Sequence, residues 1–281
     1  MKISKGLFYM MLAAFFFSLM AVSVKSLKSV IPSQEIVVGR SIVMVTIGIY
    51  LLRRRKVSIL GNDRKLLFLR GFFGFLGLSA FFYTLTTIPI ANSVVIQYTS
   101  PIFTALFAAV ILKEKLNPKL WFAFGLAFLG VILVSKPTSG FIFWPSVLGV
   151  LGAACSGIAY NLVRKLRRSE DPINIILYLP MVSIPLSLPV VIPKFVMPQG
   201  SAWLLLLLVG IFTFIAQVFL TRGLHLEKAG KATMVSYITV VFSILFGWIF
   251  WGEIPDVMSA AGAVLILIAI YINTRVKDVA N

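Results

Sequence analysis

The chain has 281 residues, of which 59% are hydrophobic and only 12% are charged. Soluble domains are about 45–50% apolar and about 25% charged, so this composition excludes an ordinary soluble domain. The net charge of +17 would suggest a nucleic-acid partner in a soluble protein, but the sequence contains no soluble basic domain to bind one. The single cysteine, Cys155, excludes an intrachain disulfide, and no Cys/His cluster predicts a metal site.

Apolar stretches of about 20 residues recur between short charged loops, and this is the length that an α-helix needs to cross a bilayer. Because irregular backbone cannot face lipid, each stretch is predicted to be a transmembrane helix. The predicted spans, in chain order, are Gly6–Val24, Gln34–Leu52, Leu67–Thr86, Ala91–Leu112, Pro118–Ser135, Phe143–Val163, Ile173–Ile192, Ala202–Leu224, Ala229–Trp251 and Val257–Asn273. In the seventh span, Pro180, Pro185 and Pro189 predict a kinked or broken helix. The sequence therefore predicts an all-α integral membrane protein with ten spans.

The basic residues alternate between the two sides of these spans. With the N-terminus inside, 21 of the 26 Lys and Arg residues fall in inner segments, including Arg64, Lys65 and Arg70 around the start of the third span. Cytoplasmic loops of membrane proteins carry an excess of Lys and Arg. We therefore expect a multi-pass protein of the inner (plasma) membrane, with both termini in the cytoplasm.

A shift of 139 residues aligns the chain with itself without a gap. LAAFFFSLMAVSVKSL falls on LGAACSGIAYNLVRKL, and the shift places Lys25 on Arg164, Gly71 on Gly210, Tyr98 on Tyr237 and Glu114 on Glu253. The shift predicts two five-helix repeats, residues 1–139 and 140–281. Because five is odd, the second repeat enters the membrane upside down. Inverted repeats let many transporters exchange two shapes around a site near the midplane.

The chain resembles the drug/metabolite transporter superfamily, and within it the EamA-domain family. The resemblance covers nearly the whole chain and rests on Glu35 and Arg40, on Tyr83 followed by TIPIANS and QYTSPIF, and on LKEKL, FGLAFLGVILV, YNLVRKL, AGKATMVSY, WGEI and Gly262. It is closest to the branch that contains vertebrate organic-anion solute carriers. One departure is Thr239–Val240 where the fourth span has Ser100–Pro101, which predicts a weaker kink in the ninth span.

Arg40 is the most informative candidate for substrate binding. It lies about two turns inside the second span, and an arginine within a membrane needs a partner or access to water. It could anchor a carboxylate or phosphate with its planar fork of donors. Alternatively, it could extend to the outer interface or pair with Glu35.

Uncharged polar residues within the spans predict a polar cavity, because such groups avoid lipid and face other helices. Tyr98 and Tyr237 are equivalent in the two repeats. The expected substrate-binding residues are Arg40, Tyr83, Gln97, Tyr98, Ser100, Asn161, Gln217 and Tyr237. Tyr160 and Tyr178 are weaker candidates.

These features favour a secondary transporter, an exchanger or facilitator, that exports a small polar metabolite such as an amino acid or organic carboxylate. All nine acidic residues lie in loops or at span ends, so no carboxylate is placed as a proton relay within the membrane. The alternative is a transporter or flippase of a lipid-linked or amphipathic substrate. A membrane-embedded enzyme is disfavoured because the spans supply no catalytic constellation. We expect no cofactor, a small-molecule substrate and the lipid bilayer as partners, and a monomer or homodimer.

Overall fold

The computed structural model describes residues 4–27, 30–88, 90–114, 117–136, 143–252 and 254–276. The predicted repeat boundary at residues 139 and 140, and Glu253, lie outside these residues. The helices in chain order are α1 (Lys5–Leu27), α2 (Ser33–Arg54), α3 (Arg64–Thr87), α4 (Ile90–Gln97), α5 (Ser100–Ile111), α6 (Pro118–Ser135), α7 (Phe143–Lys165), α8 (Pro172–Val191), α9 (Ser201–Leu226), α10 (Ala229–Met234), α11 (Ile238–Trp251) and α12 (Val257–Arg275), with short 3-10 turns η1 (Leu166–Arg168), η2 (Ile192–Lys194) and η3 (Val235–Tyr237).

Ten helical segments of the described chain are long and apolar enough to cross a membrane. The fourth consists of α4 and α5, and the ninth consists of α10, η3 and α11. Each observed end lies within about three residues of its predicted end. Large hydrophobic side chains such as Val110, Phe122 and Ile249 stay exposed on the bundle, as expected for surfaces that face lipid. The predicted all-α membrane fold is confirmed.

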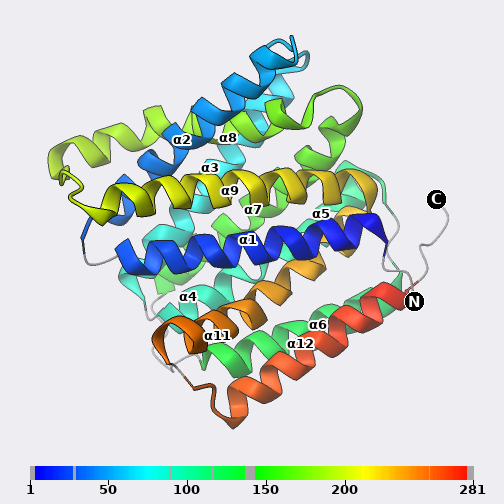
Figure 1. The fold of residues 1–281 in the computed structure, drawn as a ribbon. Coiled ribbons are helices and arrows are strands. Elements are labelled where there is room, and N and C mark those ends of the chain that lie inside the picture. The colour runs from blue at the N-terminus through cyan, green and yellow to red at the C-terminus, as the bar shows by residue number, and fades with distance from the viewer. Residues whose placement is uncertain are drawn as a thin grey trace.

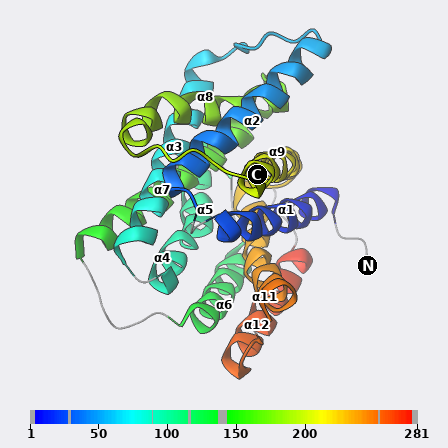
Figure 2. The ribbon, with the colours of Figure 1, turned by 60° about the vertical axis from the view of Figure 1, so that its left-hand side comes forward.

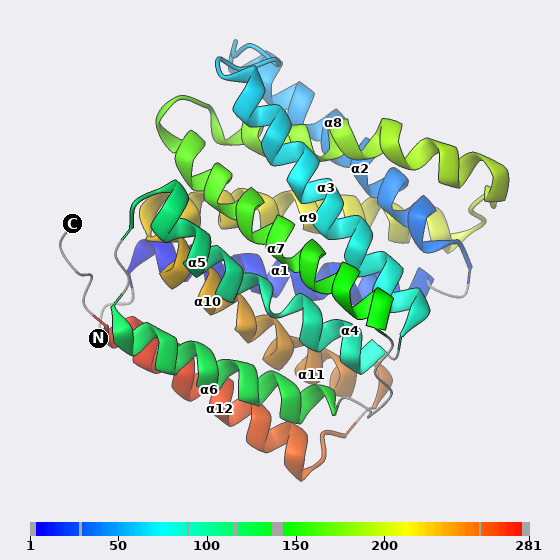
Figure 3. The same cartoon turned by 180° about the vertical axis from the view of Figure 1, so that it is seen from behind.

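The helices form a bundle with two central layers and two edges. α1 and α9 make one layer, and α3 and α7 make the other, which Figure 3 shows from behind. α2 and α8 cover one edge, while α6 and α12 pack together at the opposite edge (Figures 1 and 2). The interior between the two layers is therefore enclosed by helices from both halves of the chain.

The packing follows the internal repeat. α1 packs against α9 in one layer. Their equivalents in the other repeat, α7 and α3, pack against each other in the second layer. α2 packs against its own equivalent α8, and α6 packs against its own equivalent α12. Exchanging the two halves leaves this set of contacts unchanged. The start of α1 and the end of α12 lie on the same side of the bundle (Figure 1). The fold is thus the predicted pair of inverted five-helix repeats.

Acidic side chains begin several helices. Asp63, Asp171 and Asp256 each accept a hydrogen bond from a backbone N–H in the first turn of α3, α8 and α12 respectively. A carboxylate at this position satisfies an unpaired donor and interacts favourably with the helix dipole. Hydrogen bonds from Lys136 and from residue 259 hold the pKa of Asp256 well below its usual range. The Lys136–Asp256 ion pair joins the end of α6 to the start of α12.

Prolines have different effects on the helices of the seventh and fourth spans. The seventh span is predicted to be kinked or broken, and α8 is not broken, since it continues through Pro180, Pro185 and Pro189. Transmembrane helices tolerate proline because neighbouring groups satisfy the freed carbonyls. In the fourth span the helix is interrupted before Pro101, which lies in the first turn of α5. The ninth span is also interrupted, by η3, although it has Val240 in place of that proline.

Candidate substrate-binding site

Two tyrosines that are equivalent in the repeats contact each other in the centre of the bundle. The rings of Tyr98 and Tyr237 stack with 5.5 Å between their centroids and an interplanar angle of 24°. The Tyr237 hydroxyl donates to the Tyr98 carbonyl oxygen at 2.9 Å. The side chain of Thr239 lies near the Tyr98 hydroxyl. Repeat-equivalent residues can touch only near the axis that relates the repeats, so this pair marks the pseudo-twofold axis.

Both tyrosines lie where their helices are interrupted. Tyr98 falls between α4 and α5, and Tyr237 is the last residue of η3. A break frees backbone polar groups, and membranes tolerate this only inside the protein or beside a cavity. Broken helices that meet at the repeat axis are a common feature of substrate sites in transporters.

Arg70 is a candidate site residue that was not predicted from the sequence. Charge counting assigns Arg70 to the inner basic segment, but its side chain is only 3% exposed within α3. Its Nη2 donates to Gln217 Oε1 on α9 at 3.3 Å, and its Nε has no hydrogen-bond partner. A Cβ built on Gly74 would lie 3.1 Å from Arg70 Nη1, so the guanidinium extends one turn further into α3. Glycines on the same helix are the sequence signal that could have indicated room for it.

Tyr160 of α7 connects Arg70 with the tyrosine pair. Its side chain lies close enough to interact electrostatically with both Arg70 and Tyr98. We call Arg70, Tyr98, Tyr160, Gln217 and Tyr237 the central polar cluster. Its members come from both repeats and from both central layers of the bundle. Three of them belong to the predicted site residues.

Arg40 is buried but lies apart from this cluster. It is 7% exposed, and α2 packs chiefly against α8 and α9. No described residue forms a hydrogen bond or ion pair with it, and its Nε has no partner. The predicted pair with Glu35 does not form: Glu35 Oε2 accepts from the backbone N–H of Val196 at 3.0 Å, and Glu35 Oε1 has no hydrogen-bond partner. Arg40 as a substrate ligand stays a prediction.

The remaining predicted residues have other surroundings. Asn161 is fully buried and donates from Nδ2 to the carbonyl oxygens of Thr104 and Gly157, so it holds α7 against α5. Ser100 is buried in the first turn of α5, and Gln97 is half-buried at the end of α4. Tyr83 is 43% exposed on α3.

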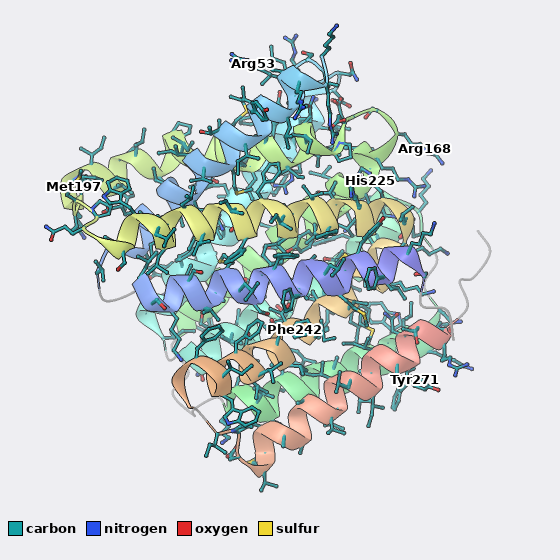
Figure 4. All side chains as sticks on the ribbon, in the orientation of Figure 1. Arg53, Arg168, Met197, His225, Phe242 and Tyr271 are labelled. Carbon is teal, nitrogen blue, oxygen red and sulfur yellow. The ribbon has the colours of Figure 1, made fainter. Side chains whose placement is uncertain are left out.

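A second charged group lies at the end of the bundle where α5 and α7 finish and α10 begins. Arg164 donates from Nε to Glu114 and from Nη1 to the carbonyl oxygen of Leu224 at 2.8 Å. Glu114 Oε2 accepts from the backbone N–H of Ala229, the first residue of α10, at 2.9 Å. The labelled side chains of Arg168 and His225 lie toward the same end of the bundle, opposite Met197 (Figure 4). This buried pair ties the first repeat to the second.

Among the described residues, no group of three His, Cys, Asp or Glu side chains is placed to hold a metal ion. The cluster instead offers hydroxyl, amide and guanidinium donors together with aromatic surface. Such groups suit recognition of a polar organic molecule.

Comparisons with known proteins agree with this description. A model of the EamA-like transporter family matches residues 4–136 and again residues 143–275. The chain is 32% identical to the pseudopaline exporter CntI of Pseudomonas aeruginosa (strain UCBPP-PA14), over 98% of each protein. It is 31% identical to solute carrier family 35 member G1 of Mus musculus, over 94% of this chain and 76% of the relative. The riboflavin transporter of Rhizobium johnstonii is 31% identical over 69% of this chain and 65% of its own length.

The relatives support both the resemblance and the class of function. Each is named as an exporter, a carrier or a transporter, so the prediction of a membrane transporter rather than an enzyme is confirmed. One solved structure, described only as a crystal structure of protein, superposes with a TM-score of 0.81 over 96% of each chain. At 22% identity, that likeness concerns the fold alone. The chain belongs to the EamA-like transporter family.

Proposed function

We propose that this protein is a secondary carrier, an exchanger or facilitator, that exports a small polar metabolite such as an amino acid or an organic carboxylate. Its two repeats, residues 1–139 and 140–281, rock against each other around the central polar cluster. The protein resides in the inner (plasma) membrane as a monomer or homodimer, with both termini in the cytoplasm.

The contact between Tyr98 and Tyr237 carries this proposal. The two rings stack where two broken helices meet, and each repeat supplies one of them. A ligand beside this pair would contact both halves, so a movement of one half against the other would change the side from which the ligand is reached. That is the geometry that alternating access requires.

Two observations support export and movement that is not driven by protons. The pseudopaline exporter, which this chain matches over nearly its whole length, supports export. The described acidic residues lie at helix ends, where Asp63 begins a helix and Glu114 pairs with Arg164. No described carboxylate is therefore placed at the midplane as a proton relay. We infer exchange or facilitated movement rather than accumulation driven by protons.

A counterflow measurement tests the proposal. The purified protein is reconstituted into liposomes loaded with an unlabelled amino acid or organic carboxylate, and a trace of the same compound with a radiolabel is added outside. We expect transient accumulation of label for at least one compound, because a carrier binds its substrate on both sides of the membrane. An imposed pH gradient should change the steady-state accumulation of a non-titrating substrate very little.

Liposomes without protein provide the background. Strong uphill accumulation driven by the pH gradient would contradict exchange. Movement of a fluorescent lipid between leaflets, without counterflow of any soluble metabolite, would instead support the alternative of a lipid-linked or amphipathic substrate.

A further inference from the structure

Arg70 is a buried cation that forms no ion pair with any described residue. Its side chain is 3% exposed, and among the described residues its hydrogen-bond partner is the neutral Gln217 amide oxygen at 3.3 Å. A guanidinium removed from water in a membrane protein usually pairs with an acid or contacts a substrate. Within the described residues, the Arg70 guanidinium therefore lacks the anionic partner that is expected for a buried cation.

The acidic residues at the inner end of the bundle are already engaged elsewhere. Glu114 binds Arg164 and a backbone N–H, and Glu227 accepts from Ser4. Glu170 accepts from the backbone N–H groups of residues 62 and 63. None of these carboxylates is hydrogen-bonded to Arg70. Because no described carboxylate is hydrogen-bonded or ion-paired to Arg70, an anion from outside the protein is a suitable partner.

The donors of Arg70 suit an oxyanion. A guanidinium presents five N–H donors in a rigid fork that matches a carboxylate or phosphate. One nitrogen, Nη2, contacts Gln217, while Nε has no partner. The Gln217 amide and the Tyr160 hydroxyl bring further donors to the same region. Gly74 leaves room for the guanidinium because it has no side chain.

The location of Arg70 connects binding with movement of the two halves. The guanidinium reaches the level of Gly74, which is near the middle of α3. Its partner Gln217 lies on α9, the helix of the second repeat that is equivalent to α3. An anion held here would contact one helix from each repeat at the depth expected for a carrier site.

We propose that Arg70 is the cationic ligand of the substrate, and that it binds a carboxylate or phosphate group in the central polar cluster. This inference rests on the proposed function, because it treats the bound anion as the transported molecule. It differs from the sequence prediction, which gives that role to Arg40.

Ligand-induced thermal stabilisation tests the site separately from transport. The full-length protein in detergent is heated with a panel of probes: glutamate, succinate, citrate, inorganic phosphate and matched neutral compounds. We expect at least one oxyanion, and not its neutral analogue, to raise the Tm. The Arg70→Met variant should lose this shift, which corresponds to at least about ten- to a hundred-fold weaker binding. The Tm shift of Arg70→Lys should lie between those of the wild type and Arg70→Met, because lysine keeps the charge but not the planar fork of donors.

The Tm without ligand distinguishes a binding residue from a structural one. Replacing an unpaired buried cation by an apolar side chain of similar size removes an unfavourable charge, so Arg70→Met should be at least as stable as the wild type. A structural arginine would give the opposite result. Gly74→Ala offers a second variant, because the added methyl approaches Arg70 Nη1 and Leu179 Cδ1 without removing the charge. Gly125→Ala is the matched control, since nothing lies within 4 Å of a Cβ built there.

The expected pattern is a reduced shift in Gly74→Ala and an unchanged shift in Gly125→Ala. The proposal is overturned if Arg70→Met keeps the wild-type shift, or if no oxyanion of the panel stabilises the wild type. It is also overturned if an anionic lipid stabilises the protein and none of the soluble oxyanions does. If the oxyanion shift depends on Arg70 but counterflow is absent, the anion site stands and the proposed function fails.

Discussion

Acidic residues of this protein begin three of its helices, and another forms a buried ion pair between the repeats. Asp63, Asp171 and Asp256 satisfy donors at helix starts, which explains why acids gather at the ends of spans. Glu114 and Arg164 form a buried ion pair whose other atoms bond to the backbone of the second repeat. Such a pair needs both members, since removing one leaves a buried charge without a partner.

We predict that Arg164→Met strongly destabilises the protein, by about 3–5 kcal/mol, because Glu114 would stay buried without its counter-charge. The free energy of unfolding in detergent micelles, measured with a denaturant, checks this. Arg168→Met is the matched control, since Arg168 is exposed in the same segment and should change stability by less than about 0.5 kcal/mol. Adding Glu114→Gln to Arg164→Met should recover part of the loss. Equal stability of Arg164→Met and Arg168→Met would contradict the interpretation.

The helices show how proline and glycine act differently by position. Proline interrupts the fourth span but not α8, since neighbouring groups can satisfy the carbonyls that proline leaves free. Glycine allows α6 and α12 to approach closely at the edge of the bundle. A Cβ built on Gly130 would lie 2.6 Å from the carbonyl oxygen of Gly262, and the converse distance is also 2.6 Å. Side chains cannot occupy this contact, so the two backbones pack directly.

Gly130→Ala and Gly262→Ala should each destabilise the protein by about 1–3 kcal/mol, because the methyl group meets backbone that cannot move aside without separating the helices. The double variant should lose less free energy of unfolding than the sum of the two single losses, since the first substitution already separates α6 from α12. Gly125→Ala, on the same helix with nothing within 4 Å, should be neutral or stabilising. Unfolding in detergent micelles measures all four proteins. A loss in Gly125→Ala as large as in Gly130→Ala would refute the role of the contact.

At the scale of the whole molecule, the two repeats enclose a centre that both of them build. The paired helices α2–α8 and α6–α12 each join equivalent elements, and the central layers exchange with each other under the repeat. The central polar cluster lies where elements of both repeats meet, as the proposed rocking of the two halves requires. The distribution of basic residues then decides how this assembly sits in the membrane.

We predict that a reporter fused after Asn281 reads as cytoplasmic and one inserted at residues 138–140 reads as external. The reason is that the sequence assigns 21 basic residues to segments predicted to be inner and four to segments predicted to be outer. A pair of reporters whose activities depend on the compartment, such as an alkaline phosphatase and a fluorescent protein, gives the measurement. The same location for both positions would contradict the topology.

The sequence by itself determined the number of membrane spans, the ends of those spans and the inverted repeat. Each depends on local properties: the length of an apolar run, the charge of a loop, or the identity of residues 139 positions apart. It also predicted Tyr98, Gln217 and Tyr237 as substrate-binding residues, and the structure places all three in the central polar cluster. Only the tertiary structure decided which charged residues are buried and what they contact. Arg70 meets Gln217 across 147 residues, and Glu114 meets Arg164 across 50, so no local pattern contains either pair. An arginine two turns inside a helix near a basic loop resembles its exposed neighbours until the helices that cover it are in place.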